Sequence, residues 1–241
     1  MELRIVHFYP DLMSLYGSYA NVAVLKKTLE TARFSVALDR VPLGGETSLE
    51  GADFVFMGAG TERAQKAALE DFRRFSDDLK RAADDGVSML FAGTAMEILG
   101  EKITDREGKE WSGLALAPFA SVQGERRIVG DVYGKTALYD GAVVGFMNKS
   151  SLVTGVETPL LTSLSMGFGN EKEGGAEGFA YQNVLGSELT GPLLVKNPHL
   201  LTHVCRAILE RRGTTAEIVP DEYLAAGYAV TEAELRKRCA E

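Results

Sequence analysis

The chain has 241 residues, of which 45% are hydrophobic and 25% are charged, and its formal net charge is −8. This length fits one large α/β domain or a domain with a small appendage, and it is enough to bury a core without disulfide bonds. The acidic balance argues against a nucleic-acid partner, and no run approaches the ~18 apolar residues that a membrane span requires.

Strands and helices alternate in the first hundred residues. Apolar runs typical of buried strands occur at 3–9, 34–43, 52–60 and 88–93. Helical patterns occur at 20–32, 63–86 and 95–100, and the second of these predicts one long amphipathic helix or two shorter ones. This alternation predicts an α/β fold with a mostly parallel central sheet and helices on both faces.

The second half of the chain is richer in β-structure. Residues 126–148 predict antiparallel strands, the Gly-rich segment 166–179 predicts a loop, and residues 178–194 predict a return to strand. An amphipathic helix is expected at 199–213, followed by a helical tail in which Thr231 and Glu234 fit a capping box. We therefore divide the chain into a main domain, residues 1–213, and a C-terminal helical extension, residues 214–241.

Histidine and cysteine patterns give no support for a metal site. His199 and His203 could share a helix face, but Leu200 stands where a zincin motif needs Glu, so an ordinary helix-surface role is expected. Cys205 and Cys239 form neither a disulfide framework nor a metal pattern. The N-terminal sequence MELRIVHFYP also lacks the regions of a signal peptide. We expect a cytoplasmic protein with reduced cysteines, no metal and no cofactor.

Two strand-to-helix junctions are candidates for a site. In GAGTERAQ, which begins at Gly58, backbone amides at a helix N-terminus could face an anion or oxyanion. Taken alone, Gly58 and Gly60 favour a simple turn, because the dinucleotide and P-loop spacings are missing. The stretch SMLFAGTAMEILG resembles a nucleophile elbow, but its tip is Gly93 and Thr94, with no Ser or Cys. Gly93 suits the positive φ of an elbow tip, although a tight turn would also accept it.

Several motifs in order resemble one family. They are YPDLMSLYGSYANVAVLKK, MGAGTERAQ, FAGTAMEILG, RRIVGDV, GFMNKSS and GFGNEKEGGAEGFAYQNVLGSELTGPLLVKNPHL. They resemble the glutamine amidotransferase subunits of lipid II isoglutaminyl synthase (GatD-like), within the type 1 cobyric-acid-synthase-like (CobB/CobQ) amidotransferases. The corresponding family patterns include GGGxDxEQ, CGGYQxLG, GFENHxG and GTYxHGPLLPKNP. The resemblance covers about residues 4–201 and implies a flavodoxin-like class I glutamine amidotransferase domain.

The chain departs from the family at the catalytic positions. The nucleophilic Cys of the family falls on Gly93, its catalytic His on Thr190, its supporting Asp on Ser18 and its elbow Gln on Glu97. What survives is a remnant of the substrate and oxyanion pocket, formed by Gly58, Gly60, Thr94 and Arg127, the last of these in the glutamine-recognition strand.

The resemblance implies a reaction and a partner. In the family, a Cys thiolate attacks the glutamine amide, His moves the proton, and ammonia passes to a Mur-ligase-like synthetase that amidates a peptidoglycan precursor. One hypothesis is a chain without glutaminase activity, acting as a binding or regulatory subunit, with glutamine or another small ligand in the remnant pocket. The alternative is an active amidotransferase or hydrolase with a rearranged site around Thr94 or residues supplied by a partner. The glycine at the elbow tip favours the first hypothesis.

Overall fold

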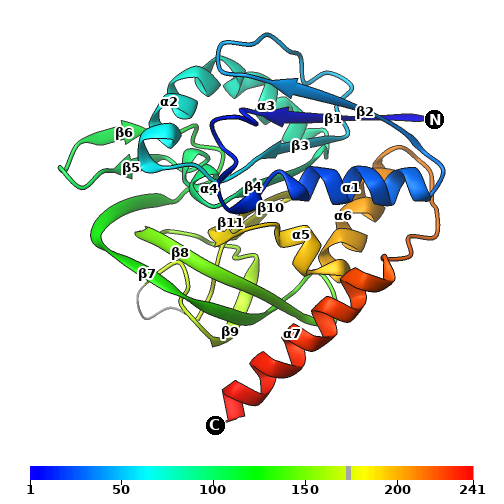
Figure 1. Cartoon of the computed structure of the whole chain (residues 1–241). Coiled ribbons are helices and arrows are strands. Elements are labelled where there is room, and N and C mark those ends of the chain that lie inside the picture. The colour runs from blue at the N-terminus through cyan, green and yellow to red at the C-terminus, as the bar shows by residue number, and fades with distance from the viewer. Residues whose placement is uncertain (172–174, 241) are drawn as a thin grey trace.

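The computed structural model describes residues 1–171 and 175–240, and two sheets organise it. Figure 1 shows the first sheet, with its helices, lying against the second sheet and the C-terminal helix. The first sheet has the strand order β10-β11-β4-β3-β1-β2. Its strands are β1 (Glu2–Phe8), β2 (Ser35–Val41), β3 (Phe54–Met57), β4 (Ser88–Ala92), β10 (Phe179–Tyr181) and β11 (Val184–Ser187). All neighbours are parallel except β10 and β11, which confirms the mostly parallel central sheet.

Helices cover both faces of this sheet. They are α1 (Ala20–Thr31), α2 (Glu62–Phe72), α3 (Ser76–Asp84), α4 (Thr94–Ile98), α5 (Leu193–Lys196) and α6 (Pro198–Arg211), with 3-10 turns at Leu15–Gly17 and Arg73–Phe75. Alternate side chains of β1 enter two cores: Leu3 and Ile5 pack with α1 and α6, whereas Val6 and Phe8 pack with α2 and α3. The pattern at 63–86 is thus two helices joined by a 3-10 turn.

Helix boundaries follow local chemistry. The Thr61 side chain accepts a hydrogen bond from the Ala64 amide at 3.1 Å and caps α2. Pro198 begins α6, where its missing N–H has no cost, and Gly213 follows the helix with a φ of 65°.

The second sheet confirms the β-rich second half. Its order is β12-β8-β7-β5-β6, with β9 paired to β7. The strands are β5 (Lys102–Thr104), β6 (Glu110–Ser112), β7 (Ala120–Thr136), β8 (Ala142–Thr154), β9 (Leu161–Met166) and β12 (Leu189–Thr190). The long pair β7 and β8 is antiparallel, as expected for 126–148, and its register shifts between Gln123 and Ile128. Of the expected loop 166–179, residues 172–174 lie outside the described residues.

The C-terminal tail forms one helix, α7 (Glu222–Ala240), beside β7, β8, β9 and α5. The Tyr228 hydroxyl donates to the Ala142 carbonyl at 2.9 Å, and the Arg238 guanidinium pairs with Asp131 at 2.6 Å. The predicted capping box is wrong, because Thr231 lies inside this helix. Its hydroxyl donates to the carbonyl of Gly227 at 2.9 Å. The division into a domain of residues 1–213 and an extension of residues 214–241 stays a prediction.

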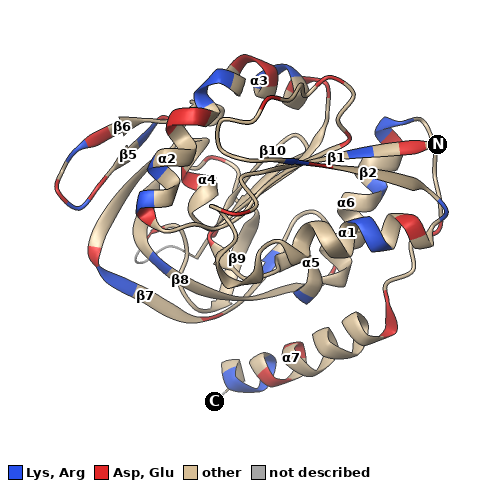
Figure 2. Cartoon of the chain, turned by 45° about the horizontal axis from the view of Figure 1, so that its top comes forward, with Lys and Arg blue, Asp and Glu red and all other residues tan. Residues whose placement is uncertain are grey.

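Charges of both signs are distributed over the molecule. Figure 2 shows basic and acidic segments close together on α3 and on α7. Many of them pair locally, such as Arg81 with Asp78 and Arg236 with Glu232. Within the described part of the chain, no helix combines the length and the apolarity needed to cross a bilayer.

Candidate functional site

The elbow between β4 and α4 has the geometry expected for its tip. Gly93 has φ 61° and ψ −137°, which confirms the predicted positive φ. Its amide donates to the carbonyl of Ser187 at 2.7 Å, so the tip is fixed to the end of β11. A Cβ on Gly93 would stand 2.6 Å from the Cβ of Ala59, so space as well as backbone conformation selects glycine here.

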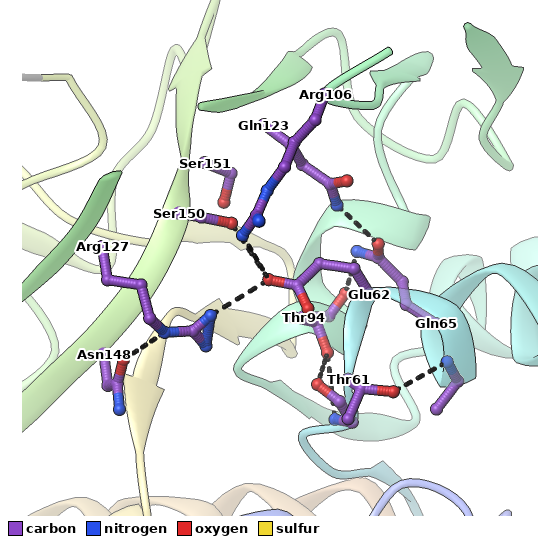
Figure 3. Close-up of polar contacts among 12 residues, drawn as sticks. Thr61, Glu62, Gln65, Thr94, Arg106, Gln123, Arg127, Asn148, Ser150 and Ser151 are labelled. Atoms are coloured by element: carbon purple, nitrogen blue, oxygen red, sulfur yellow. Dashed lines mark hydrogen bonds and ion pairs between the residues drawn. The ribbon is translucent and has the colours of Figure 1, made fainter. Parts of the chain in front are cut away.

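The hydroxyl of Thr94 forms hydrogen bonds with both the backbone amide and the backbone carbonyl of Gly60. Thr94 Oγ1 accepts a hydrogen bond from the Gly60 amide at 3.0 Å and donates to the Gly60 carbonyl at 3.0 Å (Figure 3). The amide that could have faced an oxyanion therefore already has an acceptor from the chain itself. The one hydroxyl proton of Thr94 is directed to the Gly60 carbonyl, which is not a basic group that could activate the hydroxyl.

Gly58 and Ser18 meet behind the elbow and serve packing. A Cβ on Gly58 would stand 2.3 Å from Ser18 Oγ and 2.4 Å from the carbonyl oxygen of Met13. Ser18 is fully buried there, and it is not among the residues that line the cavity described below. Ser18 and Gly58 thus lie together outside the cavity that Gly93, Glu97 and Thr190 line.

Arg127 pairs with a carboxylate of the same chain, that of Glu62. Its Nε donates to Asn148 Oδ1 at 2.7 Å and its Nη1 lies 3.1 Å from Glu62 Oε1 (Figure 3). Burial tends to raise the pKa of Glu62. Hydrogen bonds from its own amide and from Ser150, and the charges of Arg127 and Arg106, outweigh that effect and hold the pKa below its usual value. Glu62 also lies 3.7 Å from Arg106, so Arg127 shares this carboxylate with a second guanidinium group.

Thr190 faces the elbow but carries no basic group. Its hydroxyl donates to the carbonyl of Phe146 at 2.9 Å. Thr190 and Gly93 line the same small cavity, so the fold brings together the two positions where the family has its base and its nucleophile.

A buried ion pair closes the floor of this cavity. Lys149 on β8 pairs with Glu188, and both side chains are almost fully buried. Lys149 Nζ also donates to the carbonyl of Gly169 at 2.8 Å. The sequence analysis did not single out either residue. A lysine and a glutamate stand inside two of the motifs that resemble the family, and these two charges could have indicated an ion pair.

One serine links two buried carboxyl groups beside the ion pair. Ser151 Oγ lies 2.9 Å from Glu97 Oε1 and 2.8 Å from Glu188 Oε1, and Ser121 Oγ lies 2.8 Å from Glu97 Oε2. Ser151 thus bridges the two carboxyl groups, and its single hydroxyl proton can be donated to only one of them at a time.

Burial perturbs two carboxyl groups in this region. Burial raises the pKa of Glu188 to about 7, against the opposing charge of Lys149. Burial likewise raises the pKa of Glu177 to about 7, although Glu177 accepts a 2.6 Å hydrogen bond from the amide of Glu188. The interior behind the elbow thus raises the pKa of two buried carboxyl groups, Glu177 and Glu188.

The remaining cavity is too small for an amino acid. It measures about 20 Å³ and is lined by Gly60, Gly93, Thr94, Arg127 and Thr190, together with the ion pair of Lys149 and Glu188. This is room for about one water molecule, whereas ligand pockets usually measure about 300–1,000 Å³. The side chains of the chain itself fill the space beneath the elbow.

Comparison with known proteins identifies the family. Residues 4–198 match the CobB/CobQ-like glutamine amidotransferase domain. The chain belongs to this family. It is 29% identical over 216 residues to the lipid II isoglutaminyl synthase (glutamine-hydrolyzing) subunit GatD of Staphylococcus aureus strain N315, covering 90% of this chain and 88% of that protein. It is 27% identical over 215 residues to the GatD subunit of Streptococcus pneumoniae strain R6, covering 88% and 82%.

A solved structure supports the same fold. The structure of PurLQS from Thermotoga maritima superimposes with a TM-score of 0.57 at 12% identity, covering 87% of this chain and 99% of that chain. Together with the strand order and the helices on both faces, this places the chain in the flavodoxin-like class I amidotransferase fold.

The ion pair occupies two family motif positions. The His of GFENHxG falls on Lys149, and the Tyr of GTYxHGPLL falls on Glu188. The two departures carry opposite charges and meet in the structure, so each supplies the counter-ion that the other needs in a buried place. At these two motif positions the chain thus has a buried structural contact.

The histidines lie elsewhere and do not converge. His199 packs against the rings of Tyr139 and Tyr228, His203 is half-buried, and His7 lies in β1 against Phe56. Among residues 1–171 and 175–240, no three His, Cys, Asp or Glu side chains gather in a way that could hold a metal ion.

Proposed function

We propose that this chain is a GatD-type subunit of a complex that amidates lipid II, and that it does so without hydrolysing glutamine itself. It would bind a Mur-ligase-like synthetase as a non-catalytic or regulatory partner. The family membership and the two relatives named as subunits of lipid II isoglutaminyl synthase support the first part.

The observation that carries the second part is the elbow. Its tip is Gly93, which offers no nucleophile, and the neighbouring Thr94 hydroxyl is bonded on both sides to Gly60. Thr190 offers no base, and the cavity of about 20 Å³ leaves no room for glutamine. Loss of a nucleophile and its base lowers turnover on the order of a million-fold in protease triads.

The alternative function is hydrolysis by a rearranged site around Thr94 or by residues from a partner. An assay separates the two. Ammonia release from glutamine is measured with the purified chain, alone and mixed with a Mur-ligase-like synthetase of the same organism. The S. aureus relative serves as the positive control. We expect background rates in both samples. Glutamine turnover that Thr94→Ala abolishes and Thr94→Ser retains would establish the alternative.

The partner role has its own test. The tagged full-length chain is co-expressed with the synthetase, and the mass of the purified species is measured by light scattering. A stoichiometric complex is the expected result. Two separate monomeric peaks at micromolar concentration would refute the partner role and leave the result of the ammonia assay unaffected.

A further inference from the structure

A second cavity lies between α7 and the second sheet, and it is much larger than the space beneath the elbow. It measures about 450 Å³ and opens on one side to solvent. Val144 and Phe146 of β8 and Val195 of α5 form its floor, and Leu224, Tyr228 and Leu235 of α7 form its roof. Figure 1 shows α7 running diagonally past β8 and α5, which is where this cavity is found. The volume falls within the range of about 300–1,000 Å³ that is typical of small-molecule sites.

One cation in this cavity has no partner among the described residues. Lys196 is half-buried and lines the cavity, and its side-chain ammonium forms neither a hydrogen bond nor an ion pair with any residue of 1–171 or 175–240. Its Nζ lies 3.7 Å from the point where a Cβ on Gly191 would stand, so it sits at the turn that follows Thr190. Burial lowers the pKa of Lys196, and the nearby charge of Asp131 opposes that effect.

Apart from the exposed Tyr223, the other polar side chains of the lining are already engaged. Asp131 pairs with Arg238 at 2.6 Å, the Tyr228 hydroxyl donates to Ala142 O at 2.9 Å, and the Thr231 hydroxyl donates to Gly227 O at 2.9 Å. Glu232, on the same helix, is bound by Tyr133 and Arg236. Among these groups, the Lys196 ammonium alone retains unused donors next to an apolar surface.

We propose that this cavity binds a small organic carboxylate, with the carboxylate on Lys196 and an apolar body between β8 and α7. A carboxylate is the group that a desolvated ammonium pairs with, since a charge-assisted hydrogen bond offsets the cost of burial. An apolar body is required because the floor and the roof are mostly aliphatic and aromatic.

The site is separate from the amidotransferase pocket. The two cavities share no lining residue, since Gly93, Thr94 and Thr190 line the small one and Val144, Lys196 and residues of α7 line the larger one. The roof residues all lie beyond residue 198, where the match to the family domain ends. The inference therefore does not depend on glutamine hydrolysis or on the synthetase partner.

Octanoate and octan-1-ol are a matched pair of probes, because they differ only in the charged head. Binding to the full chain is measured by isothermal titration calorimetry. We expect octanoate to bind at least tenfold more tightly than octan-1-ol, because the charged head meets Lys196. Lys196→Met should lower octanoate affinity to that of the alcohol. The control Lys237→Met, at an exposed lysine in the last turn of α7, should leave it unchanged.

A pair of substitutions at Gly227 tests the location of the site. Gly227 lines the cavity, and a Cβ there would meet nothing within 4 Å, so a larger side chain can enter without a clash. Gly227→Phe should abolish octanoate binding, whereas Gly227→Ala should retain it, and both should remain folded by circular dichroism. Equal binding of the two probes, or octanoate affinity that survives both Lys196→Met and Gly227→Phe, would overturn the proposal.

Discussion

Glu177→Gln should change how the stability of the protein depends on pH. Glu177 is fully buried, and burial raises its pKa from 4.5 to about 7. Because this pKa is higher in the folded than in the unfolded protein, the folded state binds more protons between these values. The resulting stabilisation is fully present below about pH 4.5 and is lost as the pH rises through about 7. One pKa unit corresponds to about 1.4 kcal/mol, so the loss amounts to roughly 3 kcal/mol.

The measurement is urea unfolding of the wild-type chain and of Glu177→Gln, followed by circular dichroism at several pH values from 5 to 8.5. Glutamine binds no proton, so the difference in free energy of unfolding between the two proteins isolates the titration of this one carboxyl group. We expect the wild type to lose roughly 2–3 kcal/mol relative to the variant over this range. Glu217→Gln is the control, because Glu217 is exposed and its substitution should give a nearly constant difference.

Parallel stability curves for the wild type and Glu177→Gln would refute the reasoning. They would mean that Glu177 titrates with the same pKa in both states, and hence that burial does not hold a proton on it. A difference that grew in favour of the wild type with rising pH would contradict the sign of the effect as well.

Three further results are expected. Gly93→Cys should lower the free energy of unfolding by about 1–3 kcal/mol in a urea melt and yield no glutaminase activity, and an unchanged midpoint would contradict the strain argument. Lys149→Met should lower the free energy of unfolding by about 3 kcal/mol at pH 8, because it leaves Glu188 buried without a counter-ion. Adding Glu188→Leu should recover most of that loss. Equal losses in the single and double variants would show that the two residues are not coupled. Iodoacetamide should modify the exposed Cys239 but not Cys205, because burial raises the pKa of the Cys205 thiol to about 12. Two adducts detected by mass spectrometry on the native protein would disprove this.

The features that the sequence predicted well are those that depend on local sterics and periodicity. Gly93 follows a short apolar strand and precedes a helix, and a sharp junction of that kind requires a positive φ that glycine adopts readily. The alternation of strands and helices in the first hundred residues likewise led to the parallel sheet, since each strand was flanked by helical patterns.

The contents of the pocket could not be predicted in the same way. The bond between Thr94 and Gly60 joins a side chain to a backbone 34 residues away, and Lys149 meets Glu188 across 39 residues. Such contacts depend on how β8 and the segment after β11 lie against the elbow, and no local pattern encodes that. The resemblance indicated which positions gather around the elbow, but the volume left between them depends on the side chains that fill it.

The capping-box prediction failed for a different reason. Thr231 and Glu234 have the spacing of a helix start, but a threonine hydroxyl can also bond to the carbonyl four residues earlier inside a helix. Thr231 does this with Gly227, and α7 continues through both residues. The same Thr and Glu spacing is therefore compatible with a helix start and with a helix interior. Tertiary contacts along α7 favour the helix interior.

The position of β11 in the first sheet has a consequence for the order in which the protein folds during synthesis. β4 ends at Ala92, but its second neighbour β11 begins only at Val184, and the whole of β5 to β10 is made in between. At about 5–20 residues per second, the ribosome takes several seconds to produce that stretch. During this interval one edge of β4, whose side chains are all buried in the finished protein, has no strand to pair with. The nascent chain is therefore most prone to aggregate after the first hundred residues have emerged, and the pairing of β11 with β4 ends that exposure.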